Sequence, residues 1–235
     1  GKVVIDGKDT AITSSSDGGG RVGIWGGNVS ITNGAGIEST QIGYTEPSLS
    51  NGVTIIASSL RMANNGYIAT DNYSIAGSDV GSPGLSIYSS SDISLRSGSK
   101  LSVSNKYGGH RGIFRISSNS SIYLDGGADP GFPDSSSYLF GDKIYISASN
   151  DIRMANGFYL MGGSFVSMES GRYLSLASNS FVRADSFSGV SSAEIRILAG
   201  SFIMRNSIIG SSGGTTPHLD LTSLKGIYLG NNSFL

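Results

Sequence analysis

The stretch FYLMGGSFVSMESGRYLSLASNSFVRA, residues 158–184, decides the fold. Its apolar residues come in pairs two positions apart, and successive pairs begin at Phe158, Val166, Leu174 and Val182, eight residues from one another. A period of two places the apolar side chains on one face of an extended strand. A step of eight leaves room for one short strand and one tight turn. The stretch therefore predicts short strands joined by tight corners.

The same pattern recurs along the chain. Further apolar pairs occur at Ile93 and Leu95, Leu101 and Val103, Ile144 and Ile146, Ile152 and Met154, Ile195 and Ile197, and Ile227 and Leu229. Clusters of Ser, Gly and Asn separate the pairs and favour turns. The word Arg-Met-Ala-Asn occurs at residues 61–64 and again at 153–156. Such self-similarity indicates a repeat architecture, which is typical of a β-solenoid.

The regularity of the repeat divides the chain into three segments. Residues 1–84 carry looser repeats, and residues 85–209 carry the regular octads, with loop insertions expected at 105–112 and 126–142. Residues 210–235 are interpreted as a terminal β segment that is truncated, with a further irregular stretch at 210–217.

Composition excludes several classes of protein. Charged residues make up 14% of the 235 residues, there are 35 glycines, and hydrophobic residues reach 38%, so neither a helical fold nor disorder is expected. With no cysteine, disulfides and thiol catalysis are excluded. A net charge of −1 predicts neither a nucleic acid nor an anionic membrane as partner. The longest apolar run, Phe158 to Met161, is far too short to cross a membrane.

Two architectures could close a core from such short strands. Three faces can come from one chain at roughly 24 residues per coil, or from three chains that each contribute one face per turn. Each unit offers only two inward residues, and no steady likeness occurs at the longer spacing. We therefore expect an all-β, intertwined triple-stranded β-helix formed by a homotrimer. A single-chain right-handed β-helix is the alternative.

The octads resemble those of a known group of proteins. Alternating apolar residues with Gly and Ser corners, as in SDISLRSGSKLSVSN (91–105) and GDKIYISASNDIRMANG (141–157), are similar to the trimeric β-helical shafts of bacteriophage tail fibres. The serine-rich sequences of these segments are most similar to those of tail-tip and baseplate receptor-binding proteins of phages that infect Gram-positive bacteria. The resemblance implies a homotrimer at the tail tip of the virion, attached to other tail proteins, that adheres to cell-wall or capsular polysaccharide of the host.

Two other functions remain open on the same scaffold. One is a polysaccharide depolymerase, a lyase or glycoside hydrolase of the hyaluronidase-like kind, and the other is a structural spacer. Tyr107, Arg111, Arg115 and Asp125 could form a catalytic set across a subunit seam. Nothing in the sequence singles out an acid and a base, so no catalytic residue is assigned.

Aromatic and polar side chains in expected loops are the candidates for saccharide binding. Aromatic rings stack on sugar rings, and polar side chains bond the hydroxyl groups. The candidates are Trp25, Tyr44, Tyr107, His110, Arg111, Phe132 and Tyr138. Tyr145, Tyr159 and Tyr173 share the strand register and are weaker candidates. Packing against the core or at a subunit seam is an equally good interpretation of Trp25.

Acidic residues of the 126–142 insertion are the candidates for a metal site. Asp125, Asp129 and Asp134, with Asp142 nearby, supply the oxygen ligands that Ca²⁺ prefers. Their spacing matches no known calcium loop, and aspartates also favour turns. No other cofactor is expected. His110 and His218 would bind an ion only through copies of themselves on a three-fold axis.

Two catalytic patterns are chance matches. Gly18, Gly20 and Gly23 have the spacing of a dinucleotide-binding loop, but that loop must precede a helix and residues 22–25 indicate a strand. Gly210, Ser212 and Gly214 have the spacing of a hydrolase nucleophile elbow, which also needs a helix after it. Both are interpreted as glycine and serine corners.

Overall fold

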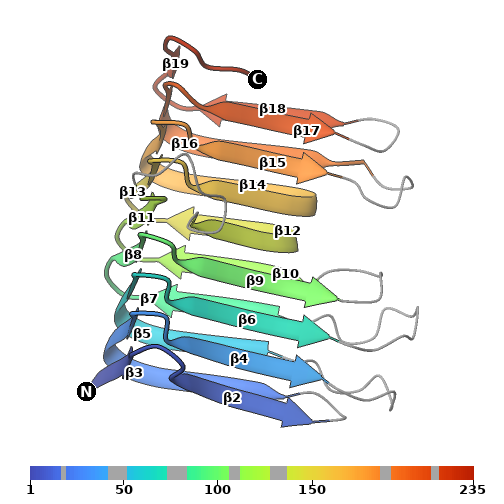
Figure 1. Cartoon of the computed structure of the whole chain (residues 1–235). Coiled ribbons are helices and arrows are strands. Elements are labelled where there is room, and N and C mark those ends of the chain that lie inside the picture. Colours follow the sequence, from blue (N-terminus) through green and yellow to red (C-terminus); the bar gives the residue numbers. More distant parts are fainter. Residues whose placement is uncertain are drawn as a thin grey trace.

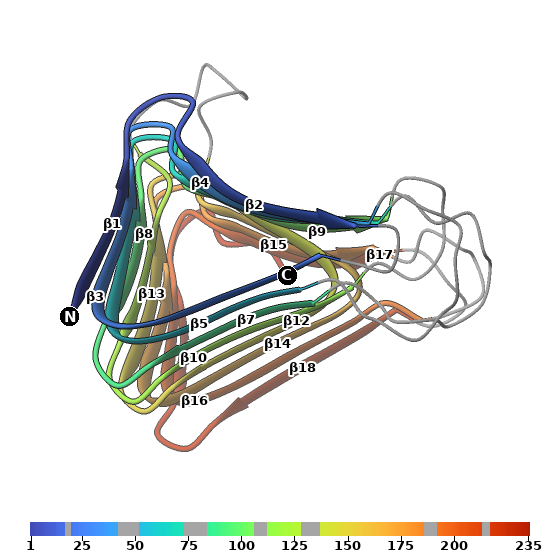
Figure 2. The ribbon, with the colours of Figure 1, turned by 90° about the horizontal axis from the view of Figure 1, so that it is seen from below.

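The chain folds into an all-β solenoid whose strands are parallel and stacked along one axis (Figure 1). The computed structural model describes residues 1–16, 20–41, 52–72, 84–105, 112–127, 137–185, 192–212 and 217–235. These residues form nineteen strands, and no helix occurs among them. Accordingly, this part of the chain contains no helix long and apolar enough to cross a membrane. Seen along the axis, the coils enclose a three-sided core (Figure 2).

Each side of the triangle is one stack of parallel strands. Face one consists of β1 (Lys2–Asp6), the second half of β3 (Arg21–Thr32), the second half of β5 (Gly52–Ala63), β8 (Ile93–Arg96), β11 (Ile122–Asp125), β13 (Asp151–Ala155), the end of β14 (Tyr159–Leu176), the end of β16 (Glu194–Met204) and β19 (Ile227–Leu229).

The other two faces follow in chain order within each turn. Face two consists of β2 (Ala11–Ser16), β4 (Gly36–Gln41), β6 (Tyr67–Asn72), β9 (Lys100–Asn105), the first parts of β12 (Tyr138–Ala148) and β14, β15 (Phe181–Asp185) and β17 (Ile208–Ser212). Face three consists of the first halves of β3 and β5, β7 (Gly84–Ser89), β10 (Ile113–Ser118), the end of β12, the middle of β14, the start of β16 and β18 (His218–Ser223).

The alternating apolar residues form ladders inside the solenoid. On face one the cross-strand partners Ile93, Ile122, Ile152 and Leu174 lie one above the other, and all are fully buried. The four pairs of the 158–184 stretch are buried as well, and they follow the three faces in turn, so that the first and the last pair both lie on face two. Because successive turns place an apolar residue at the same position along the strand, the side chains stack into one continuous core.

One chain supplies all three faces of this core, as the single-chain alternative expects. The turns differ in length, since the turn that joins Val29 to its partner Leu60 is much longer than the turn that joins Ile152 to its partner Leu174. Because the turns differ in length, no sequence repeat of one fixed spacing marks successive turns. The expectation that three chains interleave is based on the absence of such a repeat.

Tight turns at the corner between faces one and two explain the repeated tetrapeptide Arg-Met-Ala-Asn. In both copies the methionine is buried and the asparagine has a positive φ, 52° at Asn64 and 53° at Asn156. Asn65 and Gly157, the next residues, also have positive φ, which is the mark of type I′ turns. Asn and Gly tolerate this conformation best, so the tetrapeptide indicates the end of a strand and the turn that follows it.

Small residues line the corner between faces three and one. Ser89, Ser118 and Ser170 are buried there, and each donates its hydroxyl hydrogen to a backbone carbonyl oxygen at 2.6–2.8 Å. Two of these carbonyl oxygens, those of Ser58 and Asn150, also accept a backbone N–H from the next turn, so the serine hydroxyls add a second hydrogen bond there. The serines that the sequence indicates as corner residues therefore stabilise this edge of the solenoid.

The insertion expected at 126–142 is shorter than predicted. Residues 138–142 lie in β12, because buried Leu139 and Gly141 alternate with Tyr138 and Phe140 and continue the inward ladder of face two. Gly210 and Ser212 likewise lie in strand β17 rather than in a corner. Gly23 lies within strand β3, which confirms that the dinucleotide-binding match has no helix after it.

Candidate saccharide-binding face

Face three carries a ridge of exposed apolar side chains near its N-terminal end. Trp25 of β3 pairs with Ile56 of β5, which pairs with Tyr88 of β7, so the three side chains lie on neighbouring strands in one column. They are 69%, 45% and 42% exposed. An alternating strand hides every second residue, and these three occupy the outward positions. The result is an apolar ridge that crosses three neighbouring strands of this face.

The Trp25 indole lies against the sheet over Gly23. A Cβ atom at Gly23 would collide with the six-membered ring of the indole, so the ring fills the space that glycine leaves open. One face of the indole is therefore supported by the strand, while most of the side chain stays in contact with solvent. A ring held flat and open on one side is suited to stacking on a sugar ring.

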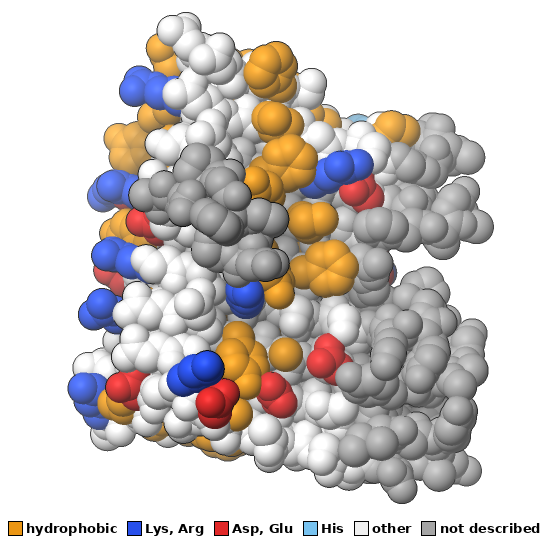
Figure 3. Space-filling view, in the orientation of Figure 1, with side chains coloured by type: hydrophobic (Ala, Val, Ile, Leu, Met, Phe, Trp, Pro, Cys, Tyr) orange, Lys and Arg blue, Asp and Glu red, His pale blue; other side chains and the backbone are white. Residues whose placement is uncertain are grey.

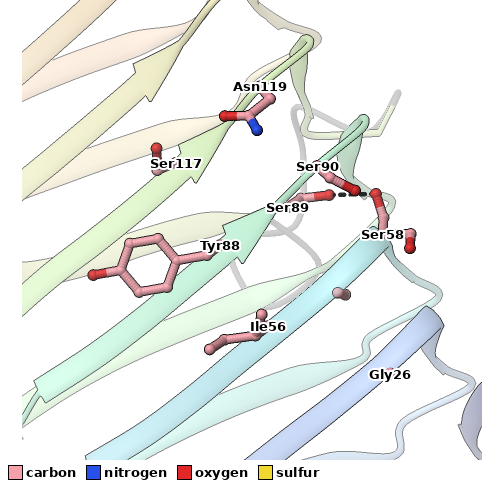
Figure 4. A pocket seen from close by; sticks show the side chains of 9 residues that line it. Gly26, Ile56, Ser58, Tyr88, Ser89, Ser90, Ser117 and Asn119 are labelled. Atoms are coloured by element: carbon pink, nitrogen blue, oxygen red, sulfur yellow. Dashed lines mark hydrogen bonds between the residues drawn. The ribbon is translucent and has the colours of Figure 1, made fainter.

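Two shallow grooves flank this ridge. The first encloses about 480 Å³ and is lined by Arg21, Val22, Gly23, Trp25, Gly52, Thr54, Gly84, Ser86, Ile113 and Arg115. The second encloses about 420 Å³ and is lined by Gly26, Ile56, Ala57, Ser58, Tyr88, Ser89, Ser90, Ser117 and Asn119 (Figure 4). Both combine apolar or aromatic side chains with hydroxyl, amide or guanidinium groups. That mixture suits a polyhydroxylated ligand.

The second groove is built on the rigid edge of the solenoid. Ser89 donates a hydrogen bond to the Ser58 carbonyl oxygen at 2.8 Å (Figure 4), and the backbone N–H of Asn119 donates to the Ser89 carbonyl oxygen at 3.0 Å. These bonds fix the groove floor. Ile56, Tyr88 and Ser117 are cross-strand partners on successive levels, so the groove runs along the solenoid axis.

Aromatic groups continue along face three beyond the ridge. The Arg115 guanidinium lies 5.4 Å from the centroid of the Tyr145 ring, and that ring lies 5.3 Å from the Phe165 ring. Their strands, β10, β12 and β14, follow β7 in the stack. Stacking and cation–π contacts hold these side chains in place, so the apolar and aromatic surface of the face extends from β3 to β14.

Two of the expected saccharide-binding residues lie in the described part of the chain, on different faces. Trp25 belongs to the ridge of face three. Tyr138 lies on face two, half-buried, and burial raises the pKa of its hydroxyl. The other expected residues, Tyr44, Tyr107, His110, Arg111 and Phe132, lie outside the described residues.

Sequence reasoning misses Tyr88, Ile56 and Tyr145. The sequence makes Tyr145, Tyr159 and Tyr173 weaker candidates because they share the strand register, yet all three are exposed. They stand one residue out of phase with the buried ladder, as Tyr145 does between buried Ile144 and Ile146. Phase within the alternation, rather than membership of a strand, is the signal that separates inward from outward aromatic residues.

The expected metal and catalytic sets are not assembled by the described residues. Asp125 accepts hydrogen bonds from the Asn156 side chain and the Gly127 backbone, and Asp142 is buried in β12. Asp129 and Asp134 lie outside the described residues, within which no group of three potential metal ligands occurs. Arg115 lies on face three and Asp125 on face one, so one chain does not bring them together. His218 lies exposed in β18.

The fold and this surface define a parallel β-solenoid with exposed aromatic side chains on its flat faces. Comparison of the chain with models of protein families, with curated proteins and with solved structures finds no match.

Proposed function

We propose that this solenoid is an adhesive segment that binds a polysaccharide along face three. The observation that carries the proposal is the Trp25 indole, which is supported by Gly23 and 69% exposed beside a groove that offers hydroxyl and guanidinium groups. A large exposed aromatic residue costs hydrophobic free energy in an unbound protein, so such a patch marks an interaction surface. Flat faces built from stacked strands suit a long ligand better than a small one.

The lining of the second groove favours uncharged sugars, because no charged side chain lines it, whereas Arg21 and Arg115 also line the first groove. Thr54, Ser86, Ser117 and Asn119 offer hydroxyl and amide groups, while Trp25 and Tyr88 offer ring faces. Hydroxyl-rich sugars use both kinds of contact. No described carboxylate lines either groove.

The resemblance of the octads to phage tail fibres supplies the setting that we propose. In this setting the segment lies at the tail tip of a virion, attached to other tail proteins, and its ligand is cell-wall or capsular polysaccharide of the bacterial host. A repetitive solenoid gives a stiff rod, since each turn is held to the next by backbone hydrogen bonds.

A homotrimer of such rods is part of the proposal, and face two offers the seam. Tyr138, Tyr159, Phe181, Ile208 and Phe234 are successive cross-strand partners that form an apolar column along this face. In the space-filling view, hydrophobic side chains gather in a column across the middle of this face (Figure 3). Burial of this column between copies would remove it from water.

The binding proposal is tested through the single tryptophan of the chain. Because Trp25 is the only tryptophan, its fluorescence reports directly on the ridge. Titration with purified host cell-wall polysaccharide is expected to shift the emission and to saturate. The variant Trp25→Ala should lose retention on a column of the same polysaccharide, while Leu224→Ala, which removes an exposed apolar residue outside the ridge and outside the proposed seam, should keep it.

The outcomes distinguish the alternative functions. Retention without release of unsaturated or reducing-end products supports an adhesin, whereas release of such products would replace it with a depolymerase. A protein that neither binds nor cleaves is a spacer, and that result would overturn the proposal. Light scattering tests the assembly separately: a mass three times the 24.3 kDa of one chain is expected, and a stable monomer would contradict the trimer.

A further inference from the structure

Five arginines make face one locally basic, although the net charge of the whole chain is close to zero. Arg61, Arg96, Arg153, Arg172 and Arg205 are all exposed on this face or at its edges. Basic side chains recur at intervals along the corresponding edge of the molecule (Figure 3). The net charge of the chain is only −1, so this grouping is local and could not be inferred from composition.

Three of these arginines lie on successive turns, each over a tyrosine ring. Arg153 lies 5.9 Å from the centroid of Tyr123, Arg172 lies 5.3 Å from Tyr173, and Arg205 lies 5.2 Å from Tyr228. They belong to β13, the end of β14 and the residue after β16, which are neighbours in the stack. Stacking on a ring restrains each guanidinium without using its N–H groups for the contact.

A buried carboxylate positions two of the three. Asp151 is only 2% exposed, because Arg153 and Arg172 cover it. Arg153 Nη2 lies 2.9 Å from Asp151 Oδ2, and Arg172 Nε lies 3.2 Å from Asp151 Oδ1. One covered carboxylate between two half-exposed guanidinium groups leaves a positive surface toward solvent. It also holds both groups in a fixed orientation, which lowers the entropic cost of binding an anion.

The remaining acids of face one are engaged in hydrogen bonds of their own, and Asp92, at the edge of the face, accepts one from the backbone N–H of Ser121. Asp125 is engaged by the side chain of Asn156 and the backbone of Gly127. Asp6, at the far N-terminal end of the face, accepts hydrogen bonds from Thr32 and Asn33. Arg205 has no carboxylate partner among the described residues.

We propose that this arginine–tyrosine stripe, defined by Tyr123, Arg153, Arg172, Tyr173, Arg205 and Tyr228, binds a linear acidic polysaccharide with a carboxylate on each sugar. Parallel turns are about 4.8 Å apart, and these three successive turns supply one arginine each. Tyr123, Arg153 and Tyr228 belong to one column of cross-strand positions, whereas Arg172 precedes that column by three residues and Arg205 follows it by two. The arginines therefore form a band rather than a single column, along which a chain of pyranose units can meet them in turn. Guanidinium groups pair with carboxylates through charge-assisted hydrogen bonds, and tyrosine edges and hydroxyls contact the sugar. The stripe lies on a different face from the Trp25 ridge, so it does not depend on the adhesin proposal.

Binding of alginate oligosaccharides to the intact chain, measured by calorimetry at low salt, tests the stripe. Alginate carries one carboxylate per sugar, and neutral dextran of the same length is the comparison. The variant Arg172→Gln/Arg205→Gln should weaken alginate binding by roughly tenfold or more, the value of one or two charge-assisted hydrogen bonds. Arg183→Gln/Arg196→Gln on the other two faces changes the net charge equally and should leave binding unchanged.

Three results would overturn the proposal. The first is an equal loss in both double variants, and the second is dextran binding as strong as alginate binding. The third is double-stranded DNA binding as tightly as alginate, which would indicate a general polyanion surface. Thermal unfolding of each variant shows whether it is folded. If Arg172→Gln destabilises the chain by exposing Asp151, the single variant Arg205→Gln decides, with a loss of several-fold expected.

Discussion

The indole of Trp25 occupies the space that the missing side chain of Gly23 leaves on the surface of β3. The two residues are two positions apart and therefore point to the same side of the strand. Glycine at the first position allows the large ring at the second to lie down on the sheet. The ridge of face three depends on this relationship, and so does its proposed use as a stacking surface.

Replacement of Gly23 by alanine should therefore lift the indole. Gly23 is not among the residues with positive φ, so the strand tolerates alanine and the stability should change by less than about 1 kcal/mol. Fluorescence emission of Trp25 should shift, and polysaccharide retention should fall toward that of Trp25→Ala. Unchanged emission in the alanine variant would show that the ring does not rest on this glycine.

Because Leu174 belongs to a buried ladder of apolar side chains, its truncation should lower the stability of the protein strongly. Leu174 is fully buried between Ile152 and Phe202 on the neighbouring turns. Leu174→Ala should lower the free energy of unfolding by about 2–5 kcal/mol, because it removes buried methyl groups and leaves a cavity. The partly exposed Leu198 is the matched control, and Leu198→Ala should cost about 1 kcal/mol or less in the same urea titration.

Positive φ at Asn64 predicts different effects of alanine and glycine. Asn64 has φ of 52°, and its side chain donates to Asn33 Oδ1 at 3.0 Å. Asn64→Ala should destabilise the solenoid by about 1 kcal/mol, since alanine resists the left-handed conformation. Asn64→Gly removes the same hydrogen bond but relieves the backbone, so chemical denaturation should find it more stable than the alanine variant. An equal loss in both would assign the effect to the hydrogen bond alone.

Alkaline pH should destabilise the protein through Tyr67. Burial, followed by the hydrogen bond to Glu38 at 2.7 Å, raises the pKa of the Tyr67 hydroxyl to about 12. In the unfolded chain this hydroxyl ionises near its ordinary pKa of about 10. The unfolded state thus loses the proton first, and the free energy of unfolding falls as pH rises between the two values.

Comparison of wild type with Tyr67→Phe isolates this effect. The phenylalanine variant should lose less stability between about pH 10 and pH 12 in urea titrations. Spectrophotometric titration of the wild type should also show a late-ionising tyrosine that the variant lacks. Parallel pH profiles for the two proteins would contradict the assignment.

Much of the fold is predictable from short-range patterns. The alternation of Leu174 and Leu176 with polar residues identifies strands and their inward side, because the period of two is a property of the extended backbone itself. Serine, glycine and asparagine clusters identify corners because few other residues accept their conformations. From the sequence, Tyr138 is expected in a loop, because the nearby prolines and glycines indicate a loop more strongly than one short stretch of alternating residues indicates a strand.

Local patterns of residues suffice to predict an all-β chain of short strands with one buried side, because alternation and turn chemistry act over a few residues. That one chain closes the core is visible only in the folded molecule, since turns of unequal length stack in register once backbone hydrogen bonds select their partners. The surfaces also depend on the folded chain. Trp25, Ile56 and Tyr88 meet in one column, and Arg153, Arg172 and Arg205 gather on another face, because stacking brings together residues that are distant in the sequence.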